Sequence, residues 1–107
     1  MFIYHVVLPA VWERFKSKPS YQPDSLTTEG FIHCSYASQL DGVLERYYSG
    51  VEKVLILTID TDKLLSKLVK EASTNNELFP HIYGRLNINS VVDVEERVLR
   101  TDEFGSL

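Results

Sequence analysis

Residues Lys53 to Asp60 read KVLILTID, and the centre of this stretch, Val54 to Leu57, is continuously apolar. A short apolar run between charged residues is typical of a β-strand that is buried on both faces. We therefore expect this segment to be a strand in the interior of the fold. An apolar run of four residues is far too short to cross a bilayer, and we expect no membrane partner.

The residues on either side of this strand predict a mixture of strands and helices. Phe2 to Val7 is rich in β-forming residues, and Pro9 suits the first turn of a following helix. Leu40 to Tyr48 has apolar residues at helical spacing, and Gly50 is placed to end that helix. The other expected elements are an irregular crossing between Pro19 and Pro23, a strand over Phe31–Ser35, a helical turn over Leu64–Lys67, and strands over Leu68–Ala72 and Val91–Leu99. This order predicts an α+β fold, because it lacks the strict βαβ alternation of a doubly wound sheet.

The length and composition are those of one globular domain. The chain has 107 residues, of which 44% are hydrophobic and 24% are charged. A chain of this size has room for one core, so we expect a single domain over residues 1–107 with a frayed tail over 102–107. Cys34 is the single cysteine, which excludes an intramolecular disulfide. This usage, and an N-terminus without the pattern of a signal peptide, favour a cytoplasmic location.

The charge of the chain argues against long nucleic acids as partners. The formal net charge is −4, and the lysines and arginines are dispersed among acidic residues. General nucleic-acid binders usually carry a basic excess that releases counterions from phosphates. A small anionic ligand, held by a few groups, remains compatible with this balance, and the sequence gives no indication of protein partners.

Two of the three histidines lie in predicted strands. His5 lies within the first strand, where it is either a hydrogen-bonded structural residue or a ligand contact. In the later strand, side-chain alternation places Phe31, His33 and Ser35 on one face. The Ser35 hydroxyl could hold an anion, or it could cap the helix that follows. Cys34 points to the opposite face and is expected in the core.

The third histidine lies in the most unusual stretch, residues 79–84, which read FPHIYG. The proline restricts the residue before it to extended geometry, and Gly84 permits a positive φ or the close approach of a ligand. Phe79 and Tyr83 therefore flank His81 in a stiff segment. This arrangement suits a site that stacks on a flat ring and offers one polar group, and a structural turn with buried aromatic residues is the alternative.

The remaining candidates are two carboxylates and two tyrosines. Glu71 and Glu77 lie on either side of a polar loop and could orient a sugar hydroxyl or activate an acceptor, although exposed carboxylates without a function are common. Tyr47 and Tyr48 complete the apolar stripe of their helix and are expected in the core.

A zinc site built from the three histidines is a further alternative. The chain has no His-x-His or His-x-x-x-His spacing and no clear carboxylate partner for such a site. We therefore expect no metal.

Taken together, these motifs resemble a bacterial family called domain of unknown function 952 (DUF952). The resemblance runs from about residue 2 to residue 99, and it is carried by Ile3-Tyr4-His5, Trp12, Gly30 to Ser35, Glu71, and Phe79 to Gly84. Folds of that family look like the ADP-ribosyltransferase superfamily. This likeness implies small, bent, split β-sheets with two main helices and a cleft that binds NAD.

The resemblance also implies roles for individual residues. His5 matches a first-strand histidine that holds ribose. A second motif near the nicotinamide is matched by Phe31, His33 and Ser35. The other residues expected to line the nucleotide site are Phe79, Tyr83 and Gly84.

A later motif of the superfamily often supplies a glutamate, and the local candidates are His81, Glu77 and Glu71. Among these, His81 would be a polar anchor or acid–base group, and Glu71 a ribose partner or a support behind it. His33 and His81 depart from the usual histidine, tyrosine and glutamate pattern.

The expected function is therefore the binding of NAD or an ADP-ribose-type nucleotide, with NAD as a possible co-substrate. The chain would transfer ADP-ribose to a small-molecule or phosphorylated acceptor. A non-catalytic nucleotide-binding module and a metal-dependent histidine enzyme are the two alternatives.

Overall fold

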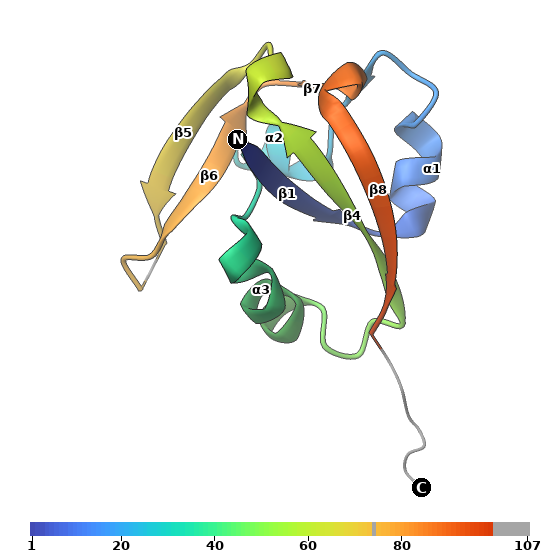
Figure 1. Ribbon diagram of the computed structural model, residues 1–107, viewed down its shortest axis with the longest axis vertical. Coiled ribbons are helices and arrows are strands. Elements are labelled where there is room, and N and C mark those ends of the chain that lie inside the picture. The colour runs from blue at the N-terminus through green and yellow to red at the C-terminus, as the bar shows by residue number, and fades with distance from the viewer. Residues whose placement is uncertain (74, 100–107) are drawn as a thin grey trace, which may run out of the picture.

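The structure is a computed structural model that describes residues 1–73 and 75–99, so the tail expected to fray lies outside the described residues. The α-helices and strands, in chain order, are β1 (Phe2–Val7), α1 (Pro9–Phe15), β2 (Ser20–Tyr21), α2 (Asp24–Thr28), β3 (Ile32–His33), α3 (Leu40–Tyr47), β4 (Lys53–Asp60), β5 (Lys67–Ala72), β6 (Leu78–Tyr83), β7 (Leu86–Asn87) and β8 (Val91–Val98) (Figure 1). Three short 3₁₀ helices, at Ala37–Gln39, Thr61–Lys63 and Ile88–Ser90, join some of them.

The strands form three small antiparallel sheets. In the first sheet, β4 lies between β1 and β8, in the second β2 pairs with β7, and in the third β6 lies between β3 and β5. Figure 1 shows the first and third sheets side by side, with α1 and α3 packed around the first. The fold is therefore a mixed arrangement of helices and several small sheets.

The central strand β4 is buried on both faces, as its apolar sequence predicts. Leu57 and Ile59 point into the main core, whereas Val54 and Ile56 pack against α3 on the other side of the sheet. Alternation along an extended strand sends successive side chains to opposite faces, so one strand serves two clusters. Burying apolar side chains stabilises the fold by roughly 1.5–3 kcal/mol each.

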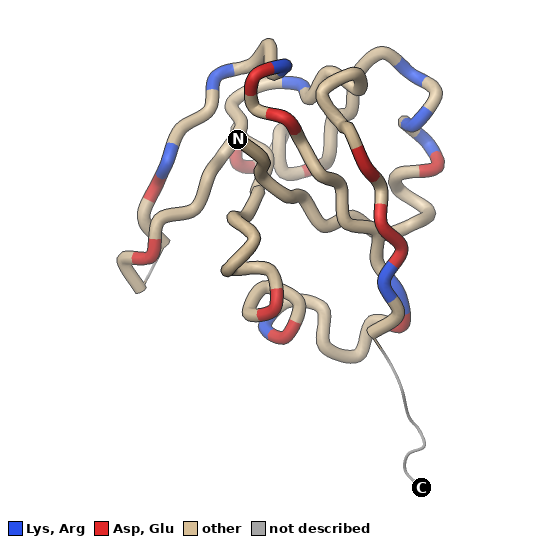
Figure 2. Tube along the Cα trace, viewed as in Figure 1, with Lys and Arg blue, Asp and Glu red and all other residues tan. Residues whose placement is uncertain are grey.

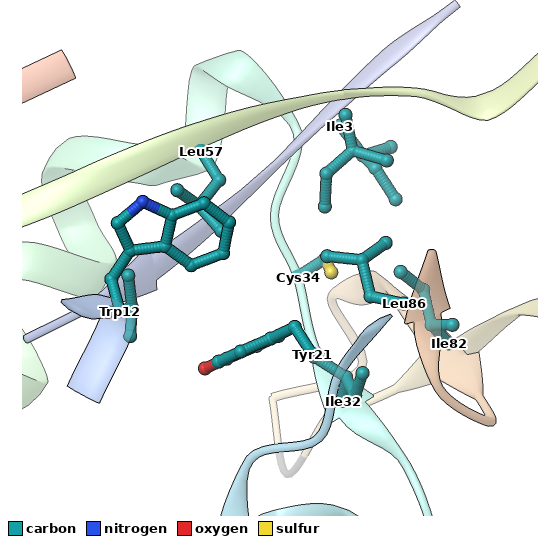
Figure 3. Packing of buried hydrophobic residues seen from close by; sticks show 10 residues of the cluster. Ile3, Trp12, Tyr21, Ile32, Cys34, Leu57, Ile82 and Leu86 are labelled. Carbon is teal, nitrogen blue, oxygen red and sulfur yellow. The ribbon is translucent and has the colours of Figure 1, made fainter. Parts of the chain in front are cut away.

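The main core lies between the first and third sheets. Its buried side chains come from distant parts of the chain, and those labelled in Figure 3 are Ile3, Trp12, Tyr21, Ile32, Cys34, Leu57, Ile82 and Leu86. Cys34 is only 3% exposed, which confirms the expected core position. Burial raises the pKa of its thiol far above the usual range, so the residue is an apolar packing group rather than a nucleophile.

Several elements differ from the sequence-based expectation. The stretch between Pro19 and Pro23 contains β2, which forms only because residues from β7 pair with it. The strand predicted over Phe31–Ser35 is shorter, and Ser35 instead pairs with Tyr4 in an isolated bridge. These pairings are long-range, so no local pattern reports them.

Two other local predictions also need correction. The helical turn expected over Leu64–Lys67 lies earlier, at Thr61–Lys63, where the Asp60 side chain accepts a hydrogen bond from the Asp62 amide. Ser35 does not cap a helix. The amide of Tyr36 instead donates to the Gln39 side chain at the start of the 3₁₀ turn before α3.

Charged residues are distributed over many elements (Figure 2). Acidic residues are prominent along the edge strand β8, and lysines lie on β5 and on the segment after α1. Charges on an edge strand hinder pairing with another chain. Among the helices of residues 1–73 and 75–99, none has the length and apolar character needed to span a bilayer.

Candidate functional site

The third sheet brings two histidines together. In its antiparallel register His33 of β3 lies opposite His81 of β6, and the neighbouring pair Ile32 and Ile82 is fully buried. Because side chains alternate across a strand, the isoleucines anchor one face in the core and both imidazoles occupy the other face. The two rings lie with their centroids 5.2 Å apart and nearly perpendicular. We call His33 and His81 the imidazole pair.

A phenylalanine packs against both rings of the imidazole pair. Phe31 stacks on His81 with centroids 4.2 Å apart and planes 16° apart, and it meets His33 edge-on at 4.8 Å. Tyr83 lies 5.3 Å from Phe31 on the same face. The alternation expected for the FIHCS segment is confirmed, since Phe31 and His33 share a face and Cys34 lies in the core.

Each imidazole is held by a carboxylate. His81 Nδ1 lies 2.7 Å from Glu71 Oε1, and His33 Nε2 lies 3.0 Å from Glu29 Oε1. The Tyr83 hydroxyl also donates to both oxygens of Glu71, at 2.7 and 2.8 Å. The hydrogen bonds from Tyr83, and secondly from His81, lower the pKa of Glu71, which keeps this carboxylate ionised. A carboxylate bound to one ring nitrogen fixes the orientation and tautomer of an imidazole.

The two carboxylates leave different nitrogens of the imidazole pair open. A neutral His81 donates from Nδ1 to Glu71, so its Nε2 carries the lone pair. A neutral His33 donates from Nε2 to Glu29, so its Nδ1 carries the lone pair. In the part of the chain that the structure describes, neither open nitrogen has a hydrogen-bond partner. Both are available to a ligand.

The imidazole pair lies in the wall of a cleft of about 750 Å³. Ser35 and Phe79, two of the predicted nucleotide contacts, line the same cleft. The other groups that line it include Val6 and Val7 of β1, Arg14 and Phe15 of α1, Glu29, and Val43, Tyr47 and Tyr48. Clefts of roughly 300–1,000 Å³ with mostly apolar walls and a few polar groups are usual for small-molecule sites.

The tyrosine pair of α3 is not a core pair. Tyr47 is 68% exposed and borders the cleft, so its predicted core position is wrong. Tyr48 is partly buried against the second core cluster, where burial raises its pKa, and it follows the prediction more closely.

His5 lies at the bottom of the cleft with both ring nitrogens engaged. Nδ1 donates to the His33 backbone carbonyl at 2.6 Å, and Nε2 accepts from the Tyr21 hydroxyl at 2.8 Å. The side chain is buried, and burial lowers its pKa from 6.5 to about 4. His5 is therefore neutral at pH 7, and a ribose hydroxyl could reach Nε2 only by displacing Tyr21.

The remaining predicted contacts are distributed around the cleft rather than in it. Three of them lie outside its lining: Phe31 and Glu71 contact His81, and Tyr83 contacts Glu71. Gly84 has a φ of +146°, and a Cβ there would lie 2.5 Å from the Ser66 Oγ. A neighbouring serine, rather than a ligand, thus accounts for the glycine.

Glu77 has a structural partner, since the Gln39 side chain donates to it at 3.0 Å. No three His, Cys, Asp or Glu side chains within residues 1–73 and 75–99 are placed to share a metal ion. His5 in particular offers no open nitrogen to join the imidazole pair in such a site.

Three residues of the site were not among the sequence candidates. Glu29 comes four residues before His33, and its carboxylate meets the ring across a turn that contains Gly30, with φ of +89°. Tyr21 lies in a stretch that reads as irregular, and Arg14 reads as an ordinary exposed helix residue. The one sequence signal for the segment that contains Tyr21 is its position between two prolines.

Comparison with known proteins gives a family and a fold. The sequence model of the family described as "Protein of unknown function (DUF952)" matches residues 6–94. The crystal structure of protein CC0527 from Caulobacter crescentus is 26% identical, with a TM-score of 0.80 over 95% of this chain and 89% of that chain. A double mutant of CC0527 (25% identity, TM-score 0.79) covers the same shares.

The solution structure of CC0527 is 27% identical, with a TM-score of 0.76 over 97% of this chain and 89% of that one. No curated protein matches the chain. The family description and the names of these structures state no activity.

Proposed function

We propose that this chain, which belongs to the DUF952 family, binds NAD or an ADP-ribose-type nucleotide in the cleft that contains the imidazole pair. The proposal includes an ADP-ribosyltransferase-like fold, which is consistent with small separate sheets beside one cleft. The carrying observation is that two carboxylate-oriented imidazoles lie in the wall of a cleft large enough for a nucleotide.

The lining of the cleft suits the parts of such a ligand. Phe15, Tyr47 and Phe79 offer aromatic rings on which a flat base or a nicotinamide could pack. Arg14 offers a guanidinium, which matches phosphate geometry well. Ser35, two residues after His33, lines the same cleft, and its hydroxyl could contact phosphate or ribose.

His81 of the imidazole pair would act as the base in ADP-ribose transfer. The bond between nicotinamide and ribose breaks, and nicotinamide leaves as a neutral molecule with the bonding electrons. An acceptor oxygen forms the new bond to the ribose carbon and releases its proton to the open Nε2 of His81. Glu71 stabilises the resulting imidazolium, because it is an ionised carboxylate bound to the other nitrogen.

In this scheme His5 has a supporting role. Its Nδ1 holds the His33 carbonyl and its Nε2 is occupied by Tyr21. We propose that it shapes the floor of the cleft, and that ribose meets it only after the Tyr21 hydroxyl turns away.

Titration of untagged ¹⁵N-labelled protein with NAD and with ADP-ribose tests binding. We expect localised amide shifts around the imidazole pair and β1. Phe79→Ala, which removes a ring from the cleft, should weaken binding about tenfold or more. Leu78→Ala is the matched control, because Leu78 is the preceding residue on β6, is 51% exposed and lies outside the cleft lining.

Two outcomes would contradict the proposal. If neither NAD nor ADP-ribose at millimolar concentration shifts any amide signal, the proposal that the cleft binds a nucleotide is wrong. If Phe79→Ala and Leu78→Ala weaken nucleotide binding equally, the nucleotide does not bind in the cleft. If binding is confirmed but no nicotinamide is released with any acceptor, the chain is a nucleotide-binding module and the transfer step is wrong.

A further inference from the structure

We infer that the imidazole pair is a general acid–general base pair that hydrolyses a phosphodiester bond in a nucleotide. This inference rests on the nucleotide binding proposed above for the same cleft, and it adds a second reaction class to that site. ADP-ribose transfer needs a base for its acceptor but no acid for nicotinamide. The site contains two oriented imidazoles, so one of them has no task in that reaction.

The first argument is the complementary orientation of the two rings. Glu71 takes Nδ1 of His81 and leaves Nε2 open, whereas Glu29 takes Nε2 of His33 and leaves Nδ1 open. The two rings are locked by different elements, β5 and the end of α2, although they lie on neighbouring strands. Two independent carboxylates would be needless if a single imidazole did the proton transfer.

The second argument is spacing. The ring centroids lie 5.2 Å apart with the planes at 75°, so the two imidazoles are in edge-to-face contact and both can reach one phosphate that lies against the pair. In a displacement at phosphorus the attacking and leaving oxygens lie roughly in line on opposite sides. One imidazole can therefore face the attacking oxygen while the other faces the leaving oxygen. Arg14 and Ser35 line the same cleft and can contact the other phosphate oxygens.

The third argument is the difference in exposure between the rings. The His81 side chain is 14% exposed and is stacked on Phe31, whereas that of His33 is 54% exposed. His81 is thus the better-positioned base, with a fixed lone pair on Nε2. His33 is in contact with solvent, from which a general acid can regain a proton after each turnover.

The reaction is balanced as follows. Nε2 of His81 accepts a proton from water while the water oxygen forms a bond to phosphorus. The bond from phosphorus to the leaving ribose oxygen breaks, and that oxygen takes the proton from Nδ1 of protonated His33. The products are a phosphomonoester and a free hydroxyl, and the two imidazoles return to their starting states by exchanging protons with solvent.

The direct test uses adenosine 2′,3′-cyclic monophosphate as a probe substrate. We expect hydrolysis to adenosine monophosphate with a bell-shaped pH–rate profile. The charged groups that hydrogen-bond to the imidazole pair are Glu29 and Glu71, and Tyr83 hydrogen-bonds to Glu71 behind His81. His33→Asn and His81→Asn should each lower kcat by about 10²–10⁴-fold, the usual range for acid–base catalysis.

A second probe separates the acid from the base. The p-nitrophenyl ester of thymidine 5′-monophosphate releases p-nitrophenolate, which leaves without a proton. His33→Asn should therefore be almost as active as wild type on this ester, whereas His81→Asn should stay impaired. Leu65→Ala is the control variant, because Leu65 is 84% exposed and lies outside the cleft lining. Amide spectra of each variant verify folding.

The outcomes separate this inference from the proposed function. ADP-ribose binding without hydrolysis of either probe would overturn the inference and leave the nucleotide site standing. The absence of both binding and hydrolysis would overturn both. Hydrolysis that persists in the double variant of His33→Asn and His81→Asn would also overturn the inference, because the activity would then belong to other groups or to a contaminant.

Discussion

Acidification from pH 7 to pH 4 should destabilise the folded protein through His5. This ring is buried, and burial lowers its pKa from 6.5 to about 4. In the unfolded chain the ring takes up a proton near pH 6.5, whereas in the folded protein it stays neutral until about pH 4. The contribution of His5 to stability is therefore fully present above about pH 6.5 and is lost as the pH falls through that window to about 4.

The size of the effect follows from the width of this window. One pKa unit corresponds to about 1.4 kcal/mol of differential stabilisation, so the shift of His5 corresponds to roughly 3 kcal/mol. This is a large fraction of the roughly 5–15 kcal/mol by which domains are usually stable. The folded state cannot easily avoid the loss, because Nδ1 and Nε2 are already bound by the His33 carbonyl and the Tyr21 hydroxyl.

Urea unfolding at pH 7, 6, 5 and 4, followed by the fluorescence of the buried Trp12, measures the loss. His5→Asn is the control, because its amide nitrogen can replace Nδ1 as a donor to the His33 carbonyl but does not titrate. The variant should be less stable at pH 7 and lose much less stability than wild type between pH 6.5 and 4. Glu71, whose pKa is lowered, contributes only below its usual value of 4.5. Equal losses in the two proteins would refute the assignment to His5.

Three further predictions concern single side chains. Gly84→Ala should lower the free energy of unfolding by more than about 1 kcal/mol, because Gly84 has a positive φ and an added Cβ would meet a serine. Gly50→Ala, at a φ of +87° with open space around it, should lower that free energy by less, and equal urea midpoints for the two variants would contradict the steric argument. Tyr83→Phe should raise the pKa of Glu71 toward its usual value, since the tyrosine hydroxyl is the main cause of the depression; an unchanged carboxyl titration in ¹³C NMR spectra would contradict this. Cys34 should resist a thiol reagent at pH 8 until the protein unfolds, and rapid labelling of the native protein would show that the thiol is not in the core.

Local sequence was enough to predict the elements that have a strong pattern of their own. The apolar centre of KVLILTID required a strand buried on both faces, and β4 confirms this. The stripe that begins at Leu40 predicted α3, and Gly50 lies just beyond its end with a positive φ. Alternation placed Phe31 and His33 on one face. In each case the deciding interactions lie within a few residues of each other.

The site itself depends on contacts that no local pattern contains. His33 and His81 are 48 positions apart and meet because β3 and β6 pair in one particular register, which a slip of one residue would destroy. Glu71 reaches His81 across the β5–β6 hairpin, and Glu29 meets His33, four positions on, across the turn that contains Gly30 rather than along a helix.

The sequence by itself determined that His5, His33 and His81 are the residues to examine, because each lies in a motif with an evident face or a stiffened backbone. Only the tertiary structure decided their states. It buries His5 and occupies both of its nitrogens, and it leaves one nitrogen of each ring in the imidazole pair, which lines the cleft, without a hydrogen-bond partner among the described residues. The physical reason is that solvent exposure and hydrogen-bond partners are set by segments far away in the chain, whereas strand and helix patterns are set by neighbours.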